Sequence, residues 1–312
     1  MKKYFPLICS LISAVIFGFA MLYIKSGMKA VNEDAVKFLA FRFTVGFIGL
    51  QLMVWLGIQK VNYKNKPIKL ILLCGVLNPL LSQVLQTAST SYAPTSQISV
   101  MCATIPIFVT ILSIFVNKEM PSKKQVIFMC MTVIGVIIIN LVGGQMIGGT
   151  TTGLILIIAS IAALSFQRTY IRKASAYFTA FETIYLPTAM GAIGFSLTTI
   201  INHTMKGELS TFFNGLGTME FAISILYMGI GSCVIAFLCM TYAYGHLPIT
   251  VSSATGAFST VISLLVGVFI LNEQLRPVDI IGIIIIMVGI LGSSLSYNKN
   301  DEKGNTISIE EK

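Results

Sequence analysis

Polar side chains recur at helical spacing within the otherwise apolar stretch from Ile68 to Ser89. Asn78, Ser82 and Gln86 are four residues apart, and Gln83 is next to Ser82, so a helix would gather them into one polar stripe. Amide and hydroxyl groups donate and accept hydrogen bonds. The stripe therefore predicts hydrogen bonding, either to a small solute or to a neighbouring helix, and the two interpretations have equal weight.

Two ionisable side chains lie near the facing ends of two later apolar stretches. The planar guanidinium of Arg168 could hold the carboxylate group of a solute. The favoured interpretation is that Arg168 anchors the chain at a membrane surface, together with Arg172 and Lys173. Glu182 is the one acid in the next stretch, and it could pair with Arg168 across a short loop or take part in proton coupling.

Arg42 lies one or two helical turns inside the apolar stretch from Ala35 to Ile58. Its long side chain could extend to the membrane surface or pair with Glu33 or Asp34. We expect Arg42 to have a structural role.

Glu119 and Glu273 occupy similar places in the two halves of the chain, just before Pro121 and Pro277. Each proline begins a new apolar stretch, so each carboxylate could accept hydrogen bonds from backbone N–H groups of a helix start. The role predicted for both acids is structural.

Small hydroxyl residues mark the stretch from Ile249 to Leu271, where Ser252, Thr255 and Ser259 share one helical face. Such stripes are packing surfaces more often than binding sites. Pro106, in an earlier stretch, could bend its helix or free backbone carbonyls toward a cavity. Several aromatic residues, among them Phe17, Tyr242 and Tyr244, could line a cavity, although most aromatic residues of such a chain are expected at the membrane interface.

The chain has no pattern typical of an enzyme or a metal site. Its two histidines, His203 and His246, fall at loops and form no HExxH motif. The six cysteines are single residues within apolar stretches and form no CxxC pair, so they indicate neither a disulfide framework nor a metal site. We therefore expect no catalytic residue, no bound metal and no cofactor.

The elements that position these side chains follow from composition. Apolar residues make up 55% of the chain and charged residues 11%, with a mean hydropathy of +0.85, whereas soluble domains contain about 25% charged residues. The protein is therefore expected to be an all-α integral membrane protein. Ten stretches are long enough to cross a bilayer as helices: Pro6–Tyr23, Ala35–Ile58, Ile68–Ser89, Thr95–Val116, Gln125–Val142, Gly153–Tyr170, Phe181–Ile201, Glu220–Ala243, Ile249–Leu271 and Val278–Ser296.

The segment from Met1 to Ala20 resembles a signal peptide, with Lys2 and Lys3 before an apolar run. The run continues to Tyr23, however, and a shift of 147 positions places Phe19 on Phe166. We expect this first helix to be retained.

The net charge of +9 reflects orientation in the membrane. With the N-terminus in the cytoplasm, fifteen Lys and Arg residues fall on the inner side and five on the outer side. The positive-inside rule then predicts that both termini are cytoplasmic, and it leaves no basic patch for a nucleic acid. The polar tail, residues 298–312, is expected to be disordered in the cytoplasm.

The two halves of the chain repeat. A shift of 154 positions aligns landmark residues in order: Gly75 with Gly229, Thr87 with Thr241, Pro94 with Pro248, Glu119 with Glu273 and Gly135 with Gly289. Five helices per half is an odd number, so the two repeats, residues 1–145 and 146–297, would enter the membrane from opposite sides. The sequence thus predicts an inverted 5+5 repeat with a solute site near the midplane.

These features resemble the drug/metabolite transporter superfamily, in its EamA-like branch of ten-helix proteins with two repeats. The resemblance rests on degenerate motifs in a specific order: Arg42-Phe43, Ala88–Ala93, Pro106, Asn117-Lys118-Glu119, Gly135, Gly229, Tyr242-Ala243, Pro248, Leu271-Asn272-Glu273 and Gly289. One departure is Thr260, which stands where the repeat would place a second Pro106.

The resemblance implies a secondary-active transporter that moves a small metabolite by alternating access, with export of an amino acid or a related metabolite favoured. A sugar, a nucleotide or a drug-like cation is the alternative solute, and a channel or a non-transporting membrane protein is a weaker alternative. The partners expected are the solute, membrane lipids and, as one assembly open to such a chain, a second copy in a homodimer. Composition suggests the cytoplasmic (inner) membrane of a prokaryote.

Overall fold

The computed structural model describes residues 4–31, 34–90, 92, 101–102, 104–118, 120–141, 150–205, 207, 217–256, 258–270 and 277–296. Within these ranges the chain is helical and contains no strand. The helices of the first half are α1 (Phe5–Ala30), α2 (Ala35–Trp55), α3 (Ile68–Gly75), η1 (Val76–Leu81), α4 (Ser82–Thr90), α6 (Ile105–Val116) and α7 (Lys123–Leu141). Those of the second half are α8 (Thr151–Ala174), α9 (Ala180–Met205), α10 (Met219–Leu226), η3 (Tyr227–Ala236), α11 (Phe237–His246), α12 (Ile249–Gly256), α13 (Phe258–Ile270) and α14 (Pro277–Leu295).

Six helical segments in the described part of the chain are long and apolar enough to cross a membrane: Phe5–Ala30, Ala35–Trp55, Ile68–Gln86, Thr151–Ala174, Ala180–Met205 and Met219–His246. Large apolar side chains are exposed on outward faces, among them Ile48, Leu52, Ile193, Leu197 and Ile284. Such surface is unfavourable in water and is stable against lipid. The prediction of an all-α integral membrane protein is confirmed.

Polar side chains satisfy the exposed N–H groups at several helix starts. Asp34 accepts a hydrogen bond from the Lys37 backbone N–H at 3.0 Å before α2. Ser122 and Gln125 form a reciprocal pair at the start of α7, in which the Gln125 amide oxygen accepts from Ser122 N and the Ser122 hydroxyl accepts from Gln125 N. These are the capping interactions that end a loop and begin a helix.

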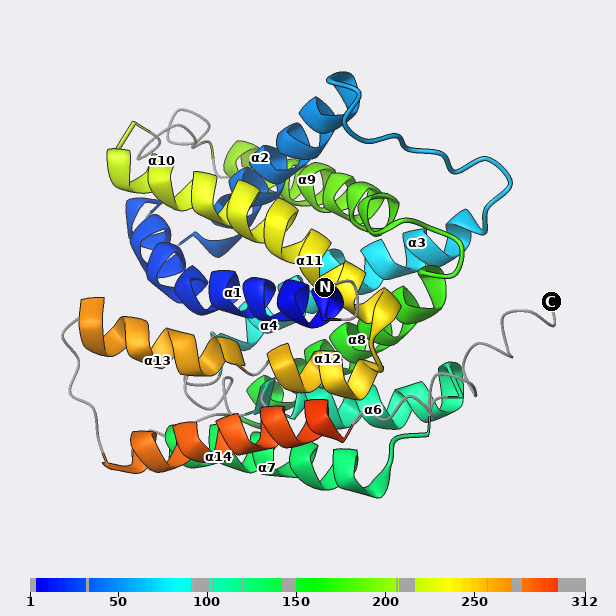
Figure 1. The fold of residues 1–312 in the computed structure, drawn as a ribbon. Coiled ribbons are helices and arrows are strands. Elements are labelled where there is room, and N and C mark those ends of the chain that lie inside the picture. Colours follow the sequence, from blue (N-terminus) through cyan, green and yellow to red (C-terminus); the bar gives the residue numbers. More distant parts are fainter. Residues whose placement is uncertain are drawn as a thin grey trace.

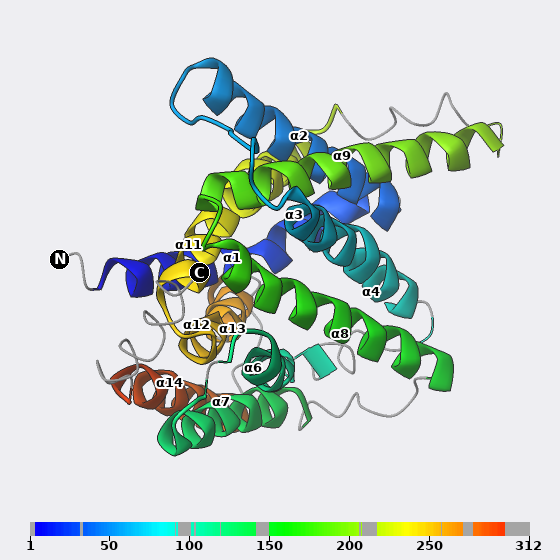
Figure 2. The same ribbon diagram turned by 90° about the vertical axis from the view of Figure 1, so that its right-hand side faces the viewer.

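Helices of each half pack against helices of the other half. Figures 1 and 2 show α7 beside α14, and α2 beside α9, and in each pair the helices occupy corresponding places in the two halves. In the same way α1 packs against α13 and η3, whereas α8 packs against α6 and α4. The shift of 154 positions places the bounds of α7 directly on those of α14.

Glycines of the repeat lie where these helices approach closely. A Cβ atom added at Gly229 would lie 2.7 Å from Val45 Cγ1, and one at Gly135 would lie 2.9 Å from the carbonyl oxygen of Gly282. Both distances are too short for a real contact. Small residues let helix backbones approach in a membrane, where dispersion forces rather than water drive association.

The third transmembrane segment of the first half is broken at its centre. Asn78 has φ −152° and ψ 124°, extended values inside the helical run, and a cis peptide bond joins it to Pro79. The corresponding segment of the second half contains the π-helix η3 at the same place. Residues 76–81, which form the π-helix η1, fall inside Tyr227–Ala236 when shifted by 154 positions. Both halves therefore depart from regular α-helix near the middle of this segment.

Candidate functional site

A cavity lies between the halves, beside the break at Asn78. Its wall comes from α1, α2 and η1 of the first half and from α8, α9 and α11 of the second. The lining residues are Phe17, Phe43, Asn78, Pro79, Leu164, Gln167, Arg168, Ile171, Thr183, Ile184, Pro187, Thr188, Phe237, Met240, Thr241 and Tyr244. The space open to the centres of water molecules is about 90 Å³, enough for several waters.

The break in η1 places extended backbone in the wall of the cavity. Extended backbone at membrane depth is tolerated where it lines a water-filled space, because its N–H and C=O groups would be unsatisfied in lipid. Asn78 and Pro79 both belong to the cavity wall. Discontinuous helices of this kind commonly form the solute sites of transporters.

Arg168 is the one charged residue among the described residues of the wall. It is half-buried, and its charge lies close enough to Tyr244 and Cys102 to interact with them electrostatically. No acidic side chain belongs to the described lining. The cavity therefore has a formal charge of +1 among otherwise neutral polar and aromatic groups.

The polar stripe predicted around Asn78 divides between two roles. Asn78 lies in the cavity wall, and its amide oxygen accepts a 2.7 Å hydrogen bond from the Ser82 hydroxyl. Ser82 connects to the second half through its carbonyl oxygen, which accepts a 2.8 Å bond from Ser160. Gln86 donates to the Cys102 sulfur at 3.6 Å, and Gln83 is half-buried outside the lining.

The residues predicted on α12, α13 and α11 lie outside the lining. The Ser252 hydroxyl donates to the carbonyls of Ala243 and Pro248, and Thr255 pairs with Ser10 of α1. Ser259 donates to the carbonyl of Gly256 in the preceding turn. These hydroxyls are used in packing, which was the favoured alternative for the stripe.

The aromatic candidate Tyr242 also faces away from the cavity. Its ring stacks on His246 with centroids 4.0 Å apart, and it contacts Phe5 edge-on. The cavity is lined instead by its neighbours Thr241 and Tyr244. The sequence contains a signal for this face, since Phe237, Met240, Thr241 and Tyr244 follow the i, i+3, i+4, i+7 helical pattern.

Arg42 makes hydrogen bonds that join the two halves. Its guanidinium donates to the Ser232 hydroxyl at 3.1 Å and to the Cys233 sulfur at 3.4 Å, both on η3. The side chain is buried, so it does not reach the membrane surface. Pairing with Asp34 is also wrong, because the Asp34 carboxylate caps α2; Glu33 lies outside the described residues.

The remaining structural candidates have separate outcomes. Pro106 lies in the first turn of α6, where a proline costs no backbone hydrogen bond. The bend predicted within Thr95–Val116 stays a prediction, because residues 95–100 and 103 lie outside the described part of the chain. Glu119 and Glu273 lie outside the described residues, and the structural role predicted for them stays a prediction. At the start of α7 the capping bonds come from Ser122 and Gln125.

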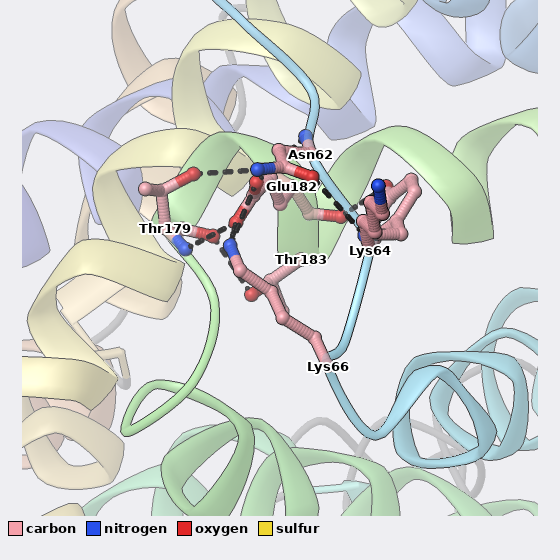
Figure 3. A network of polar contacts seen from close by, with 7 residues as sticks. Asn62, Lys64, Lys66, Thr179, Glu182 and Thr183 are labelled. Carbon is pink, nitrogen blue, oxygen red and sulfur yellow. Dashed lines mark hydrogen bonds and ion pairs between the residues drawn. The ribbon is translucent and has the colours of Figure 1, made fainter.

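Glu182 anchors the α2–α3 loop to the start of α9 (Figure 3). Its carboxylate accepts from Lys66 Nζ at 2.7 and 2.9 Å and from the Asn62 backbone N–H at 2.9 Å. It also accepts from Thr179 N at 2.9 Å, while the Thr179 hydroxyl accepts from Glu182 N, which makes a capping box. The expected pair of Glu182 with Arg168 is therefore wrong, and Lys66 is the partner.

Two aromatic rings complete this anchor. Tyr63 donates from its hydroxyl to the Glu182 carbonyl at 2.8 Å, and Lys66 Nζ lies 5.4 Å from the centre of the Phe178 ring. Burial, together with the nearby Glu182 charge, raises the pKa of the Tyr63 phenol, so it remains a hydrogen-bond donor at neutral pH. The anchor joins a loop of the first half to the second half directly beside Thr183 and Ile184 of the cavity.

Apolar helices in two similar halves, around a small cavity next to a broken helix, are typical of membrane transporters of the repeat-built class. Comparison with known proteins agrees. The model of the EamA-like transporter family matches the chain twice, over residues 5–141 and 151–295, and the protein belongs to that family.

Two curated relatives are similar over most of their length. "Uncharacterized transporter YcxC" of Bacillus subtilis is 26% identical over 297 residues, which cover 95% of each chain. An "Uncharacterized transporter" of Clostridium kluyveri is 22% identical over 260 residues, or 81% of each chain. A solved crystal structure aligns with a TM-score of 0.75 at 15% identity and covers 93% of this chain and 96% of its own, which shows a shared fold.

Proposed function

We propose that the protein is a secondary-active transporter that carries a small metabolite across a prokaryotic cytoplasmic membrane by alternating access, and that it exports an amino acid or a related metabolite. The observation on which this rests is the position of the cavity. Both halves contribute to its wall, and the first half contributes the broken segment at Asn78. A solute held between two halves changes sides when the halves exchange conformations.

The proposal includes ten transmembrane helices in an inverted 5+5 repeat, with both termini in the cytoplasm. The symmetric packing between the halves supports this arrangement. Helix α1 contacts α13 and η3 of the second half, just as α8 contacts α6 and α4 of the first half. The distribution of charge supports the orientation, with fifteen basic residues on the proposed inner side and five on the outer side.

Other solute classes and a channel predict different properties for the cavity. A drug-like cation would meet Arg168 with no acidic side chain in the described lining to pair with, so this class is disfavoured. A channel conducts through a continuous pore. The described structure shows instead a small cavity next to the bonded anchor of Glu182 and Lys66.

The test is counterflow in proteoliposomes. Vesicles are loaded with an unlabelled amino acid from a panel and diluted into trace labelled solute. A carrier accumulates label transiently above the external level. The binding site brings labelled solute in and returns to the outside loaded with the abundant unlabelled solute, so little label leaves. Saturable counterflow would support the proposal, whereas simple equilibration would indicate a channel. Vesicles without protein are the control, and cysteine labelling of the two termini from either side tests the orientation.

A further inference from the structure

Among the three arginines that the structure describes, the guanidinium of Arg168 has no hydrogen-bond or ion-pair partner in the described part of the chain. Arg42 donates to Ser232 and Cys233. Arg172 donates to the carbonyls of Tyr244 at 3.1 Å and Gly245 at 2.5 Å. Arg168 lies one helical turn before Arg172 on α8 and lines the cavity. Its five N–H donors are therefore available to a bound group.

A second polar group in the same wall also lacks a partner. Tyr244 is 2% exposed, and its buried hydroxyl makes no hydrogen bond in the described structure. A buried hydroxyl without a partner is destabilising, and native proteins keep few of them. Because Tyr244 lines the cavity, a solute there can supply the missing acceptor.

The position of Tyr244 relative to Arg168 is constrained by the chain itself. Arg172 donates to the Tyr244 carbonyl, so it ties the end of α11 to the turn of α8 that follows Arg168. Both residues line the same cavity, and the Arg168 charge also acts on Tyr244. The guanidinium and the phenol are thus arranged before any solute enters, which lowers the entropic cost of binding.

Charge decides which solute group fits. Arg168 is the one formal charge among the described lining residues, and Glu182, next to the lining residue Thr183, is already paired with Lys66. A partly buried cation gains from an anion, and a planar guanidinium binds a planar carboxylate through two parallel hydrogen bonds. The aromatic walls formed by Phe17, Phe43 and Phe237 suit an apolar side group.

We infer that Arg168 and the Tyr244 hydroxyl form a subsite for the carboxylate group of the transported solute. Arg168 supplies two hydrogen bonds and Tyr244 a third. Since the described wall has no carboxylate of its own, recognition depends on the carboxylate of the solute and not on an ammonium group. This inference rests on the proposed function, because it treats the cavity as the solute site.

Two matched sets of compounds test the inference. One set is phenylalanine, 3-phenylpropionate and 2-phenylethylamine, and the other is leucine, 4-methylpentanoate and 3-methylbutylamine. Each set keeps the apolar group and removes either the ammonium or the carboxylate. Two readouts are measured: inhibition of counterflow in vesicles, and the rise in unfolding temperature of the purified protein, which reports binding without transport.

We expect the four carboxylates of the two sets to bind and the two amines to have no effect. Arg168→Gln should weaken carboxylate binding about ten- to hundredfold. The affinity of Arg168→Lys should lie between those of Arg168→Gln and the wild type, because lysine keeps the charge but lacks the two parallel N–H donors of the guanidinium. Tyr244→Phe should weaken it about three- to tenfold, the usual effect of one hydrogen bond. Lys173→Gln, an exposed charge loss on the same helix, is the matched control and should bind as the wild type does.

The two proposals fail differently. Binding of the amines, carboxylate binding that survives Arg168→Gln, or the absence of any thermal shift in the wild type would overturn the carboxylate subsite. Carboxylate binding that requires Arg168 in a protein without counterflow would uphold the subsite and refute transport. Counterflow that is equal in the wild type and in Arg168→Gln would uphold transport and refute the subsite.

Discussion

Replacing Glu182 with glutamine should destabilise the protein, since this carboxylate anchors the α2–α3 loop to α9. The wild-type carboxylate accepts hydrogen bonds from Lys66 Nζ, Asn62 N and Thr179 N. Glutamine keeps one acceptor oxygen and the capping box, but it loses the negative charge and the second acceptor. Hydrogen bonds to charged groups contribute about 1.5–3 kcal/mol.

The exposure of the partners sets the expected magnitude. Breaking a fully buried ion pair costs about 3–5 kcal/mol because a charge is left without solvent. Here the side chain of Glu182 is 3% exposed but that of Lys66 is 26% exposed, so water partly solvates the freed ammonium. We therefore expect Glu182→Gln to lower the free energy of unfolding by about 2 kcal/mol, below the range for a buried pair.

The assay is a double-mutant cycle with Lys66→Met, followed by denaturant unfolding in detergent. The fluorescence of Trp55 is a convenient probe because it is the one tryptophan in the chain and ends α2 next to the anchored loop. The coupling energy between the two substitutions should be about 1 kcal/mol or more. Lys64→Met removes an exposed charge from the same loop and should change stability by less than about 0.5 kcal/mol.

Additive single substitutions, with a coupling energy near zero, would refute the anchor as an energetic unit. A loss of stability for Lys64→Met equal to that for Lys66→Met would refute it as well, because the effect would then follow net charge and not the contact.

Three other substitutions probe the packing and the site. Gly229→Ala should destabilise by about 1–3 kcal/mol, since the added carbon would lie 2.7 Å from Val45 Cγ1, whereas Gly217→Ala meets nothing within 4 Å and should be near neutral in the same unfolding assay. Arg42→Met should cost about 1.5–3 kcal/mol by losing the charged hydrogen bonds that Arg42 donates to η3, and unfolding like that of the wild type would contradict the structural role. Ser252→Ala should leave the KM of counterflow within about twofold, because its hydroxyl is bonded to backbone carbonyls outside the cavity, and a large rise in KM would return it to the candidate site.

The helical architecture could be predicted because a membrane makes it a local property. Every backbone N–H and C=O group in lipid needs a partner within the same helix, so an apolar run of sufficient length is enough to specify the element. The predicted starts at Ala35 and Ile68 agree with α2 and α3. The repeat was detectable for a related reason, since the glycines aligned by the shift lie where helices approach too closely for a side chain.

The candidate site was predicted only in part. Asn78 and Arg168 were both proposed as possible solute contacts, and both line the cavity. A polar group inside an apolar helix must face protein or water, which is why such residues could be selected. Of the two tyrosines of α11 proposed for a cavity, Tyr244 lines the wall together with Thr241, and Tyr242 does not. The difference is a rotation about the axis of α11, which neighbouring helices determine and the identity of the residue does not.

A helical membrane protein with two similar halves can be inferred from the amino-acid sequence alone, because apolar length and internal repetition are local and additive. The folded structure was needed to show that Glu182 pairs with Lys66, that Arg42 bonds to η3, and that Arg168 and Tyr244 share one wall. These contacts join residues distant in the chain. Their partners depend on loop paths and helix rotations, which many weak packing contacts establish together.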